Sequence, residues 1–297
     1  MDKQDTTKVP TGLELYSLAA HRAAREVIYS YSTSFGLATR ILAKKYRPHV
    51  ENVYAMVRVA DEIVDGSAAQ AKEVEQAVDP AALLTEFEME TYRAMELGYS
   101  TNLIIHAFAQ TARWAGIGKD IVEPFFFSMR QDLTDTEHDE ASFKRYVYGS
   151  AEVVGLMCLA VFVQGANYSA EQKRQLVTGA RALGSAFQKV NFLRDLAADF
   201  SRLGRSYFPG VSVTCFDEQT KQRLVADIEA DLAESSKTLD LLPAGARRAV
   251  SAAQMLFQEL NKTIEKTPAT EMISRRISVG TLSKLLILIR AVFGVKP

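Results

Sequence analysis

Two pairs of aspartates stand four residues apart in segments that are otherwise mostly apolar. The pairs are Asp61 with Asp65, in the segment 48–65, and Asp195 with Asp199, in the segment 184–200. Residues four apart differ by only about 40° around a helix axis, so each pair would share one helix face. Most acidic pairs at this spacing lie on a solvated face. Because these segments have few other polar positions, a functional role is the better interpretation.

Further polar residues precede each pair at helical spacing: Tyr54 and Arg58 before the first, Gln188 and Asn191 before the second. Carboxylates gathered inside an apolar fold need a cation to remain ionised. Carboxylates without His or Cys suit hard cations, and Mg²⁺ commonly joins one or two carboxylates to substrate phosphates. Two facing helices would therefore hold Mg²⁺, with Mn²⁺ as the second candidate, and clamp a diphosphate between them.

Histidine and cysteine do not offer a competing metal site. There is no Glu-x-x-His pair, so a ferritin-like di-iron site lacks its imidazole ligands. The histidines are expected to be structural or exposed: His21, His49, His106 and His138. Cys158 and Cys215 stand in apolar surroundings without a CxxC pair, which predicts two small buried side chains rather than a disulfide.

The elements that must position the aspartates are helices, because apolar residues recur at helical spacing almost throughout. Helices are predicted at 13–31, 48–65, 80–98, 101–116, 119–133, 141–165, 170–201, 217–241, 244–266 and 278–293. There is no strand alternation, GxGxxG motif, P-loop or internal repeat, and glycine (16) and proline (8) are few. We therefore predict one all-α domain, residues 13–297, after a flexible N-terminus of residues 1–12.

The composition excludes other classes. The 297 residues include 35 Lys or Arg and 36 Asp or Glu, and a formal net charge of −1 predicts no nucleic-acid partner. The polar start lacks a signal-peptide core, and no uninterrupted apolar run approaches the ~20 residues of a membrane-spanning helix, which predicts a cytoplasmic protein. The tail 282–295 is predicted to be an amphipathic helix on the core, with peripheral contact to the inner face of the cell membrane as a further hypothesis.

Several motifs, in their order and wording, resemble the squalene/phytoene synthases, the head-to-head prenyl transferases. The motifs are YSTSF (31–35), YAMVRVADEIVD (54–65), MRQDL (129–133), YVYGSAEVVGLM (146–157), NFLRDLAADF (191–200) and GRSYFP (204–209). The resemblance covers about residues 15–291. It implies an isoprenoid-synthase helical bundle around a central apolar cavity, with two prenyl diphosphates as substrates and Mg²⁺ as cofactor.

The resemblance also assigns roles by position. The assigned residues are Asp61, Asp65, Asp195 and Asp199 as Mg²⁺ ligands; Tyr54, Arg58, Gln188 and Asn191 as diphosphate contacts; Ser32, Ser34 and Phe35 as a substrate contact; Arg205 and Tyr207 in a closing loop; and Tyr146 at the start of a cavity-lining helix. One stripe of that helix is expected to face a prenyl chain: Tyr146, Gly149, Ser150, Val153, Met157 and Ala160. Helix packing by Gly149 and Ser150 is the alternative. Glu152 stands where many relatives have glycine, and we expect it to be exposed or paired.

The segment YGSAEVVG (148–155) looks most like the corresponding segment of bacterial phytoene synthases. Those enzymes join two geranylgeranyl diphosphates through a cyclopropylcarbinyl diphosphate. The first alternative is a squalene or dehydrosqualene synthase acting on farnesyl diphosphate, and a terpene cyclase is a more distant one. A helical subunit without catalytic activity is the alternative from another class, but it would be expected to lack an aspartate of one pair. No nicotinamide cofactor is expected.

Overall fold

Helices form nearly all of the regular structure in this computed structural model. It describes residues 11–74, 78–203, 206–211, 215–274, 276–292, 294–295 and 297, without the side chains of residues 33–34, 69, 198–203, 281–282, 284–285, 288 and 292. Within those ranges there is no strand, and a single parallel bridge joins Glu137 to Ser206. The predicted all-α class is confirmed.

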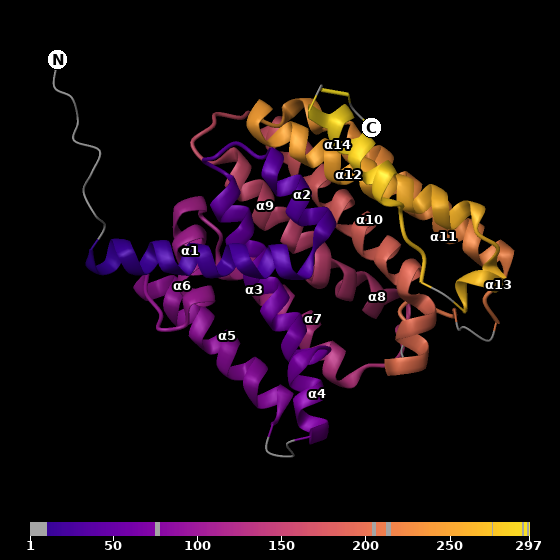
Figure 1. Cartoon of the computed structure of the whole chain (residues 1–297), viewed down its shortest axis with the longest axis horizontal. Coiled ribbons are helices and arrows are strands. Elements are labelled where there is room, and N and C mark those ends of the chain that lie inside the picture. The colour runs from indigo at the N-terminus through magenta and orange to yellow at the C-terminus, as the bar shows by residue number, and fades with distance from the viewer. Residues whose placement is uncertain are drawn as a thin grey trace.

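The predicted helices are all present, and most ends agree within a few residues (Figure 1). The elements are α1 (Gly12–Tyr31), α2 (Thr33–Ile41), α3 (Arg47–Val64), α4 (Ser67–Val74), α5 (Pro80–Leu97), α6 (Leu103–Ala115), α7 (Lys119–Thr134), α8 (Glu140–Val147), the π-helical turn η1 (Tyr148–Glu152), α9 (Val153–Val163), α10 (Ala170–Leu203), α11 (Glu218–Ser236), the 3₁₀ turn η3 (Leu239–Leu241), α12 (Ala244–Lys266), α13 (Ala269–Met272) and α14 (Thr281–Val292). The sequence pattern does not predict α2, α4 and α13, because helices of 9, 8 and 4 residues are too short to establish a period.

The break between α1 and α2 is made by one serine. Ser32 has an extended backbone, and its Oγ accepts a hydrogen bond from the N–H of Phe35 at 3.1 Å. A serine in this position caps the helix that follows it, by satisfying one of its free N–H groups. The chain therefore changes direction at Ser32, and both Ser32 and Phe35 line the central cavity.

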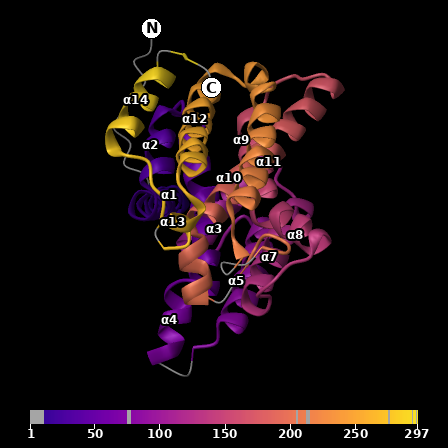
Figure 2. The same ribbon diagram turned by 90° about the vertical axis from the view of Figure 1, so that its right-hand side faces the viewer.

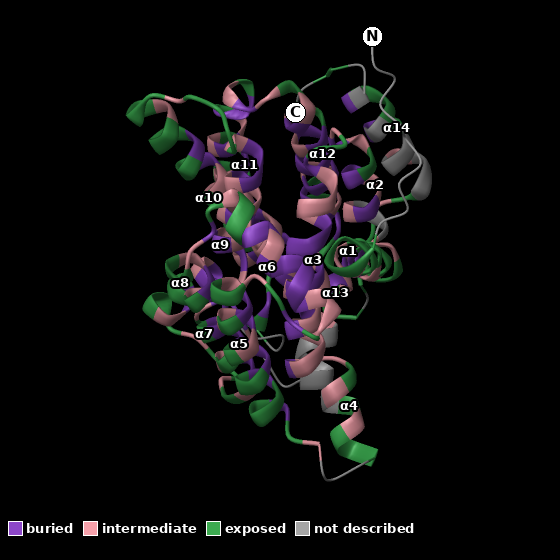
Figure 3. Ribbon diagram, turned by 90° about the vertical axis from the view of Figure 1, so that its left-hand side faces the viewer, coloured by how far each residue is buried: buried purple, intermediate pink, exposed green. Residues whose placement is uncertain are grey.

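The helices surround that cavity in two packed groups. On one side α3 packs against α1, α6, α7 and α9, and on the other α10 packs against α11, α12 and the η1–α9 segment. Figure 2 shows α10, α11 and α12 gathered in the upper part of the molecule and α4 and α5 extending below. Buried residues are frequent on α3, α6, α9 and α12, whereas the described side chains of α4 are all exposed or partly exposed (Figure 3).

The predicted helix 141–165 is interrupted by the π-helical turn η1, which lies where the chain is tightly packed. A Cβ atom on Gly149 would stand 2.1 Å from the carbonyl oxygen of Pro124, so only glycine allows this approach to α7. Helix packing at Gly149, the alternative to a cavity role, is confirmed. On the other side, Glu152 forms an ion pair of 2.6 Å with Arg181 of α10, which confirms the expectation that Glu152 is paired.

A π-helical turn accommodates one extra residue, which rotates all later side chains by about 100° relative to an uninterrupted α-helix. The stripe predicted to face the cavity is therefore wrong beyond Ser150. Val153 and Met157 are fully buried in the cluster with α7, and Gly149 and Ala160 do not line the cavity either. The lining residues of this segment are instead Tyr146, Ser150, Ala151, Val154, Gly155, Cys158, Leu159 and Phe162.

The run Glu140–Val163, from α8 to α9, is long and apolar enough by length and composition to cross a membrane. In this fold half of its most apolar window is buried, and the run packs against α3, α7 and α10. Further apolar residues of the run line the cavity, among them Val154, Leu159 and Phe162. These contacts identify it as the central core helix.

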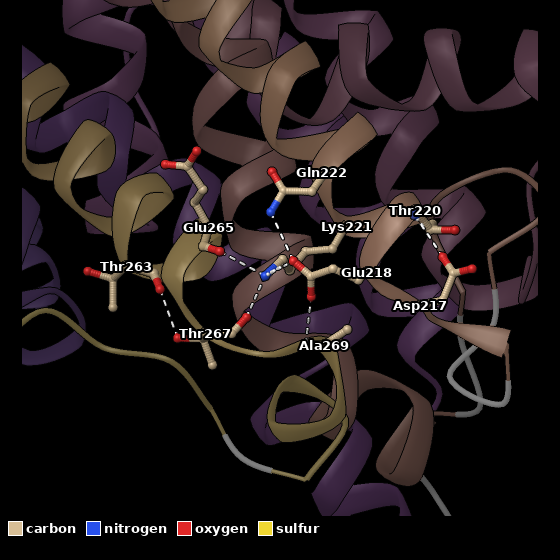
Figure 4. Close-up of polar contacts among 9 residues, drawn as sticks. All are labelled: Asp217, Glu218, Thr220, Lys221, Gln222, Thr263, Glu265, Thr267 and Ala269. Atoms are coloured by element: carbon tan, nitrogen blue, oxygen red, sulfur yellow. Dashed lines mark hydrogen bonds and ion pairs between the residues drawn. The ribbon is translucent and has the colours of Figure 1, made fainter.

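A buried lysine ties the end of α12 to the start of α11 (Figure 4). The Nζ of Lys221 donates to the carbonyl oxygens of Glu265, at 2.8 Å, and Thr267, at 2.6 Å, and pairs with Glu218 at 2.8 Å. Glu218 in turn accepts from the N–H of Ala269 at 3.3 Å. These bonds satisfy free carbonyls at the end of α12. They also anchor the beginning of the segment that leads over the cavity to α14.

Candidate active site

A cavity of about 1220 Å³ lies between the two groups of helices. Its walls come from α2, α3, η1, α9, α10 and α12, and residues 276–279 lie along it. Along α10 the lining extends from Leu176 to Asp195, which is about 28 Å at the rise of an α-helix. The volume exceeds the usual range for small-molecule pockets, about 300–1,000 Å³.

The two ends of the cavity differ in chemistry. Carboxylates from α3 and α10 line one end: Asp61, Asp65 and Asp195. The other end is closed by the apolar cluster that α2, α9, α10, η3 and α12 share: Leu42, Leu159, Phe162, Leu176, Leu239, Leu242 and Ala249. The cavity therefore suits a long apolar molecule whose polar head lies at the carboxylate end.

The first predicted stripe reaches the cavity as a unit, since Tyr54, Arg58, Asp61 and Asp65 all line it. One detail differs from the prediction: α3 ends at Val64, and Asp65 is its C-cap, with φ −125° and ψ −12°. The N–H of Asp65 still donates to the carbonyl oxygen of Asp61 at 2.9 Å, so the turn is continuous. The two carboxylates stay on one side of the chain.

Burial raises the pKa of Asp61 to about 7, from 3.8. The Arg58 guanidinium opposes this rise in part, and the neighbouring carboxylate of Asp65 adds to it. Ionising the Asp61 carboxyl therefore costs free energy in this position unless a further cation lies beside it.

This raised pKa predicts a pH dependence of stability. Between about pH 4 and pH 7 the native state holds a proton on Asp61 that the unfolded chain has lost, so the free energy of unfolding of the metal-free protein falls as the pH rises through this window. The Asp61→Asn variant cannot ionise there and is expected to lose this component of the slope. Urea unfolding in the presence of a chelator measures it. Equal slopes for the two proteins would contradict the assignment.

Arg58 is held at the carboxylate end by two contacts. It forms an ion pair with Glu62, one helical turn away, and its guanidinium lies 4.5 Å from the ring centre of Tyr31. Glu62 also accepts from the N–H of Ser67 at 2.9 Å, which fixes the pair against the start of α4. The Nε of Arg58 is buried without a hydrogen-bond partner. The Arg58 side chain as a whole is 33% exposed and lines the cavity, so an anion there can reach the guanidinium.

The second stripe comes from α10, where Gln188, Asn191 and Asp195 line the cavity as predicted. The side chain of Asp199 lies outside the described residues. Asp195 accepts hydrogen bonds from the Nε of Arg194, at 3.0 Å, and from the Nε of Arg276, at 2.7 Å. Both arginines line the cavity, so this end carries fixed positive charge beside its carboxylates.

Neither of these arginines is predicted from the sequence. Arg194 stands directly before Asp195 in the motif NFLRDLAADF, so its position in the motif was the available signal. Arg276 lies in the non-helical connection between α13 and α14, where no period or motif marks it. Its place beside Asp195 depends on how the chain folds back from the end of α12.

A second polar group lies beside the carboxylates. The hydroxyl of Tyr146 donates to the buried Asp132 of α7 at 2.7 Å, and burial, together with that carboxylate, raises the pKa of Tyr146 well above 10. Tyr207 stacks on Phe192 with ring centres 4.0 Å apart, and both line the cavity. The predicted site residues Tyr146 and Tyr207 lie side by side, with ring centres 5.5 Å apart. Asp132 was not predicted, although its motif MRQDL had been noted, and Arg205 lies outside the described residues.

Aromatic rings form another part of the cavity wall. Phe35 lies within 6.2 Å of Tyr54, 5.8 Å of Phe187 and 5.7 Å of Phe257, measured between ring centres. Phe187 and Phe257 are stacked at 3.8 Å. Ser32 also lines the cavity, as predicted, whereas the side chain of Ser34 lies outside the described residues.

Cys158 and Cys215 separate in the fold. Cys158 lines the apolar part of the cavity, where burial raises the pKa of its thiol to about 12. Cys215 is exposed, so the prediction that it is buried is wrong. It lies in the connection after α10, where an apolar neighbour in sequence does not imply a buried position.

The donor set fits a hard divalent cation in part. Carboxylate oxygens are the ligands such ions prefer. Within the described ranges no three acidic, histidine or cysteine side chains gather in one cluster, so oxygens from a substrate would have to complete a coordination shell. The raised pKa of Asp61 fits as well, because a bound cation favours the ionised carboxylate and releases its proton.

Comparison with known proteins agrees with this geometry. Residues 28–283 match the squalene/phytoene synthase family. The chain is 25% identical to a 15-cis-phytoene synthase of Pantoea ananas, over 88% of this chain and 87% of that protein. It is 27% identical to a bifunctional lycopene cyclase/phytoene synthase of Neurospora crassa, over 66% of this chain but only 37% of that longer protein.

The fold is similar to that of a solved dehydrosqualene synthase, with a TM-score of 0.76, 21% identity, and 93% of this chain and 96% of that chain covered. That likeness confirms the predicted isoprenoid-synthase fold. The family match extends over most of the sequence, and the matched range includes both aspartate pairs. The chain belongs to the squalene/phytoene synthase family of prenyltransferases.

Proposed function

We propose that the protein condenses two geranylgeranyl diphosphates head to head to form phytoene, with release of both diphosphates. The observation that carries the proposal is the cavity, which extends about 28 Å along α10 and joins carboxylates of two helices at one end to an apolar wall at the other. Its volume of about 1220 Å³ suits two long prenyl chains better than one small ligand. The relatives named as phytoene synthases support the choice of product.

The carboxylate end is where the leaving diphosphate would lie. A divalent cation held there by Asp61, Asp65 and Asp195 would neutralise the diphosphate and act as a Lewis acid. Arg58 would place its guanidinium beside the diphosphate, and its fixed charge would stabilise the negative charge that gathers as the C–O bond breaks. Gln188 and Asn191 would hydrogen-bond the same group.

The rest of the reaction follows from ionisation. The C–O bond pair leaves with diphosphate, and the 2,3-alkene of the second substrate attacks the allylic cation to form a carbon–carbon bond. Proton loss closes a cyclopropane, giving a cyclopropylcarbinyl diphosphate. Its own ionisation, rearrangement and loss of a second proton give the linear product. Two diphosphates and two protons leave in total, so no reductant is required.

The aromatic wall would protect this chemistry. Phe35, Phe187 and Phe257 pack on one another beside Tyr54 and exclude water from the carbocation. The faces of such rings also attract positive charge. No base is assigned among the described residues of the cavity, and the released diphosphate is proposed to accept the proton.

Product analysis tests the proposal. Labelled geranylgeranyl or farnesyl diphosphate is incubated with the protein and Mg²⁺, and the hydrocarbons are separated by chain length. A forty-carbon product from geranylgeranyl diphosphate is expected. If only farnesyl diphosphate reacts, giving a thirty-carbon product, the proposed substrate is wrong. A cyclic product, or no product from either substrate, would reject the condensation itself.

A further inference from the structure

The histidine at position 138 packs on two tyrosines of the site. Its ring centre lies 4.9 Å from that of Tyr146 and 6.3 Å from that of Tyr207, and the rings of His138 and Tyr207 are within 18° of parallel. Both separations fall in the range of about 4.5–7 Å that paired aromatic rings prefer. Tyr146 and Tyr207 line the cavity, whereas His138 is not among the described residues that line it. The histidine therefore supports the two tyrosines from outside the cavity.

The backbone holds His138 in place from both sides. On one side, the N–H of Ser206 donates to the carbonyl oxygen of Thr136 at 2.9 Å. On the other side, Asp139 caps α8: its side chain accepts from the N–H of Ser142 at 2.7 Å, and the Oγ of Ser142 accepts from the N–H of Asp139 at 2.9 Å. Such a capping box fixes the chain where it enters a helix. A residue between these two contacts presents its ring in one direction.

The contact at Ser206 also anchors the segment that carries Tyr207. Within residues 206–211 the Oγ of Ser206 donates to the carbonyl oxygen of Val211, so the segment turns back on itself. Connections between helices normally run over the surface of a protein. Tyr207 and Phe208 are nevertheless buried, although they lie in the connection between α10 and α11. Packing of their rings against the rest of the protein therefore holds this segment down.

Four rings from separate parts of the chain meet here, and we call His138, Tyr146, Phe192 and Tyr207 the aromatic cluster. Tyr207 lies between its partners: its ring centre is 4.0 Å from that of Phe192 and 5.5 Å from that of Tyr146. Tyr146, Phe192 and Tyr207 line the cavity, as does Asp132, which accepts the hydrogen bond of Tyr146. The aromatic cluster is therefore a part of the cavity wall that depends on packing between α8, α10 and a connection without regular structure.

We propose that His138 is a positioning residue that holds Tyr207 against Tyr146 and thereby keeps water out of the cavity at this wall. The inference rests on the proposed function, in which a carbocation forms inside the cavity. Water that reaches the cation bonds through its oxygen to the cationic carbon and loses a proton, which gives an alcohol in place of the hydrocarbon. His138 contacts no reacting atom, so its effect passes through the two tyrosines.

The test is the ratio of alcohol to hydrocarbon that the full chain forms from labelled geranylgeranyl diphosphate with Mg²⁺. His138→Ala is expected to raise this ratio at least about fivefold, because a loosened Tyr207 admits water to the cation. Each molecule that turns over divides its cation between the two products, so a smaller folded fraction does not change the ratio. A ratio within about twofold of that of the unchanged protein would overturn the proposal.

Two further variants separate ring packing from other roles. His138→Phe keeps a ring and removes both nitrogens, so it is expected to retain the low ratio, and a rise equal to that of His138→Ala would overturn the packing role. His49→Ala is the matched control, because His49 also stacks on an aromatic ring, that of Trp114 at 3.9 Å, and neither residue is among the described residues of the cavity lining. Its ratio is expected to stay unchanged. An equal rise in this control would show general loosening and would also overturn the proposal.

Hydrogen exchange without substrate tests the position of Tyr207 separately from the reaction. The N–H groups of Ser206 and Val211 are hydrogen-bonded, and His138→Ala is expected to speed exchange in a peptide covering residues 206–211 at least about tenfold, whereas His138→Phe should not. Unchanged exchange in His138→Ala would overturn the proposal even in an active protein. Faster exchange in a protein that converts no prenyl diphosphate would support the positioning of Tyr207 by His138 and reject the proposed function.

Discussion

The double substitution Asp61→Asn/Asp195→Asn is expected to lower kcat/KM at least about a thousandfold while the fold is retained. Under the proposed function, each substitution removes a charged oxygen ligand from one wall of the cavity, so the cation that would stabilise the leaving diphosphate would lose a partner on both helices. Asparagine has nearly the shape of aspartate, and at position 61 it removes a charge that is costly to bury. Product formation from labelled substrate measures the effect, and circular dichroism and thermal unfolding report the fold.

The chain contains a matched control for this experiment. Asp227 and Asp231 of α11 have the same four-residue spacing, but they pair with Lys189, at 2.6 Å and 2.8 Å, and do not line the cavity. Asp227→Asn leaves Lys189 paired to Asp231 and is expected to leave turnover unchanged. Full activity in the Asp61/Asp195 variant would remove the metal assignment, whatever the control shows.

Replacing Arg58 with methionine is expected to lower kcat by about 100-fold to 1,000-fold, the usual loss when one preorganised donor to a developing negative charge is removed. Arg58 lies at the carboxylate end of the cavity, and its side chain is partly exposed there. Arg58→Lys should recover only part of the loss, because lysine restores the charge but not the planar fork. Steady-state kinetics of the three proteins separates kcat from KM.

Arg174→Met is the matched control, since Arg174 also pairs with a glutamate of its own helix, Glu171, but is exposed and remote from the cavity lining. It is expected to keep the activity of the unchanged protein. Arg58→Met with kcat within about threefold of that activity would contradict a role in stabilising the leaving group. A rise in KM with constant kcat would assign Arg58 to binding alone.

These two predictions depend on residues that the sequence identifies by local pattern. Tyr54, Arg58 and Asp61 lie on one helix, so a spacing of three or four residues is enough to place them on one face. The same reasoning places Gln188, Asn191 and Asp195 together on α10, and all of them line the cavity. The apolar surroundings of both pairs distinguish them from Asp227 and Asp231, whose helix is mostly polar.

Contacts between distant segments escape such reasoning. Asp132 meets Tyr146 across two helices, and Arg276 reaches Asp195 from 81 residues further along the chain. Neither Asp132 nor Arg276 belongs to a periodic pattern of polar residues that would identify it in the sequence. Their positions follow from packing: Gly149 lets η1 approach α7, and Lys221 anchors the segment after α12.

The sequence by itself determined the all-α class, nearly all of the longer helices and the two carboxylate faces, because these follow from periodicity within single helices. Tertiary structure alone decided which residues of the η1–α9 segment line the cavity. The π-helical turn shifts the later residues by about 100°, and that turn arises where the helix meets the Pro124 carbonyl, a contact between segments. Tertiary structure also decided which arginines lie beside Asp195. The sequence does not reveal this, because contacts between distant segments, unlike the faces of a single helix, produce no periodic pattern of residues.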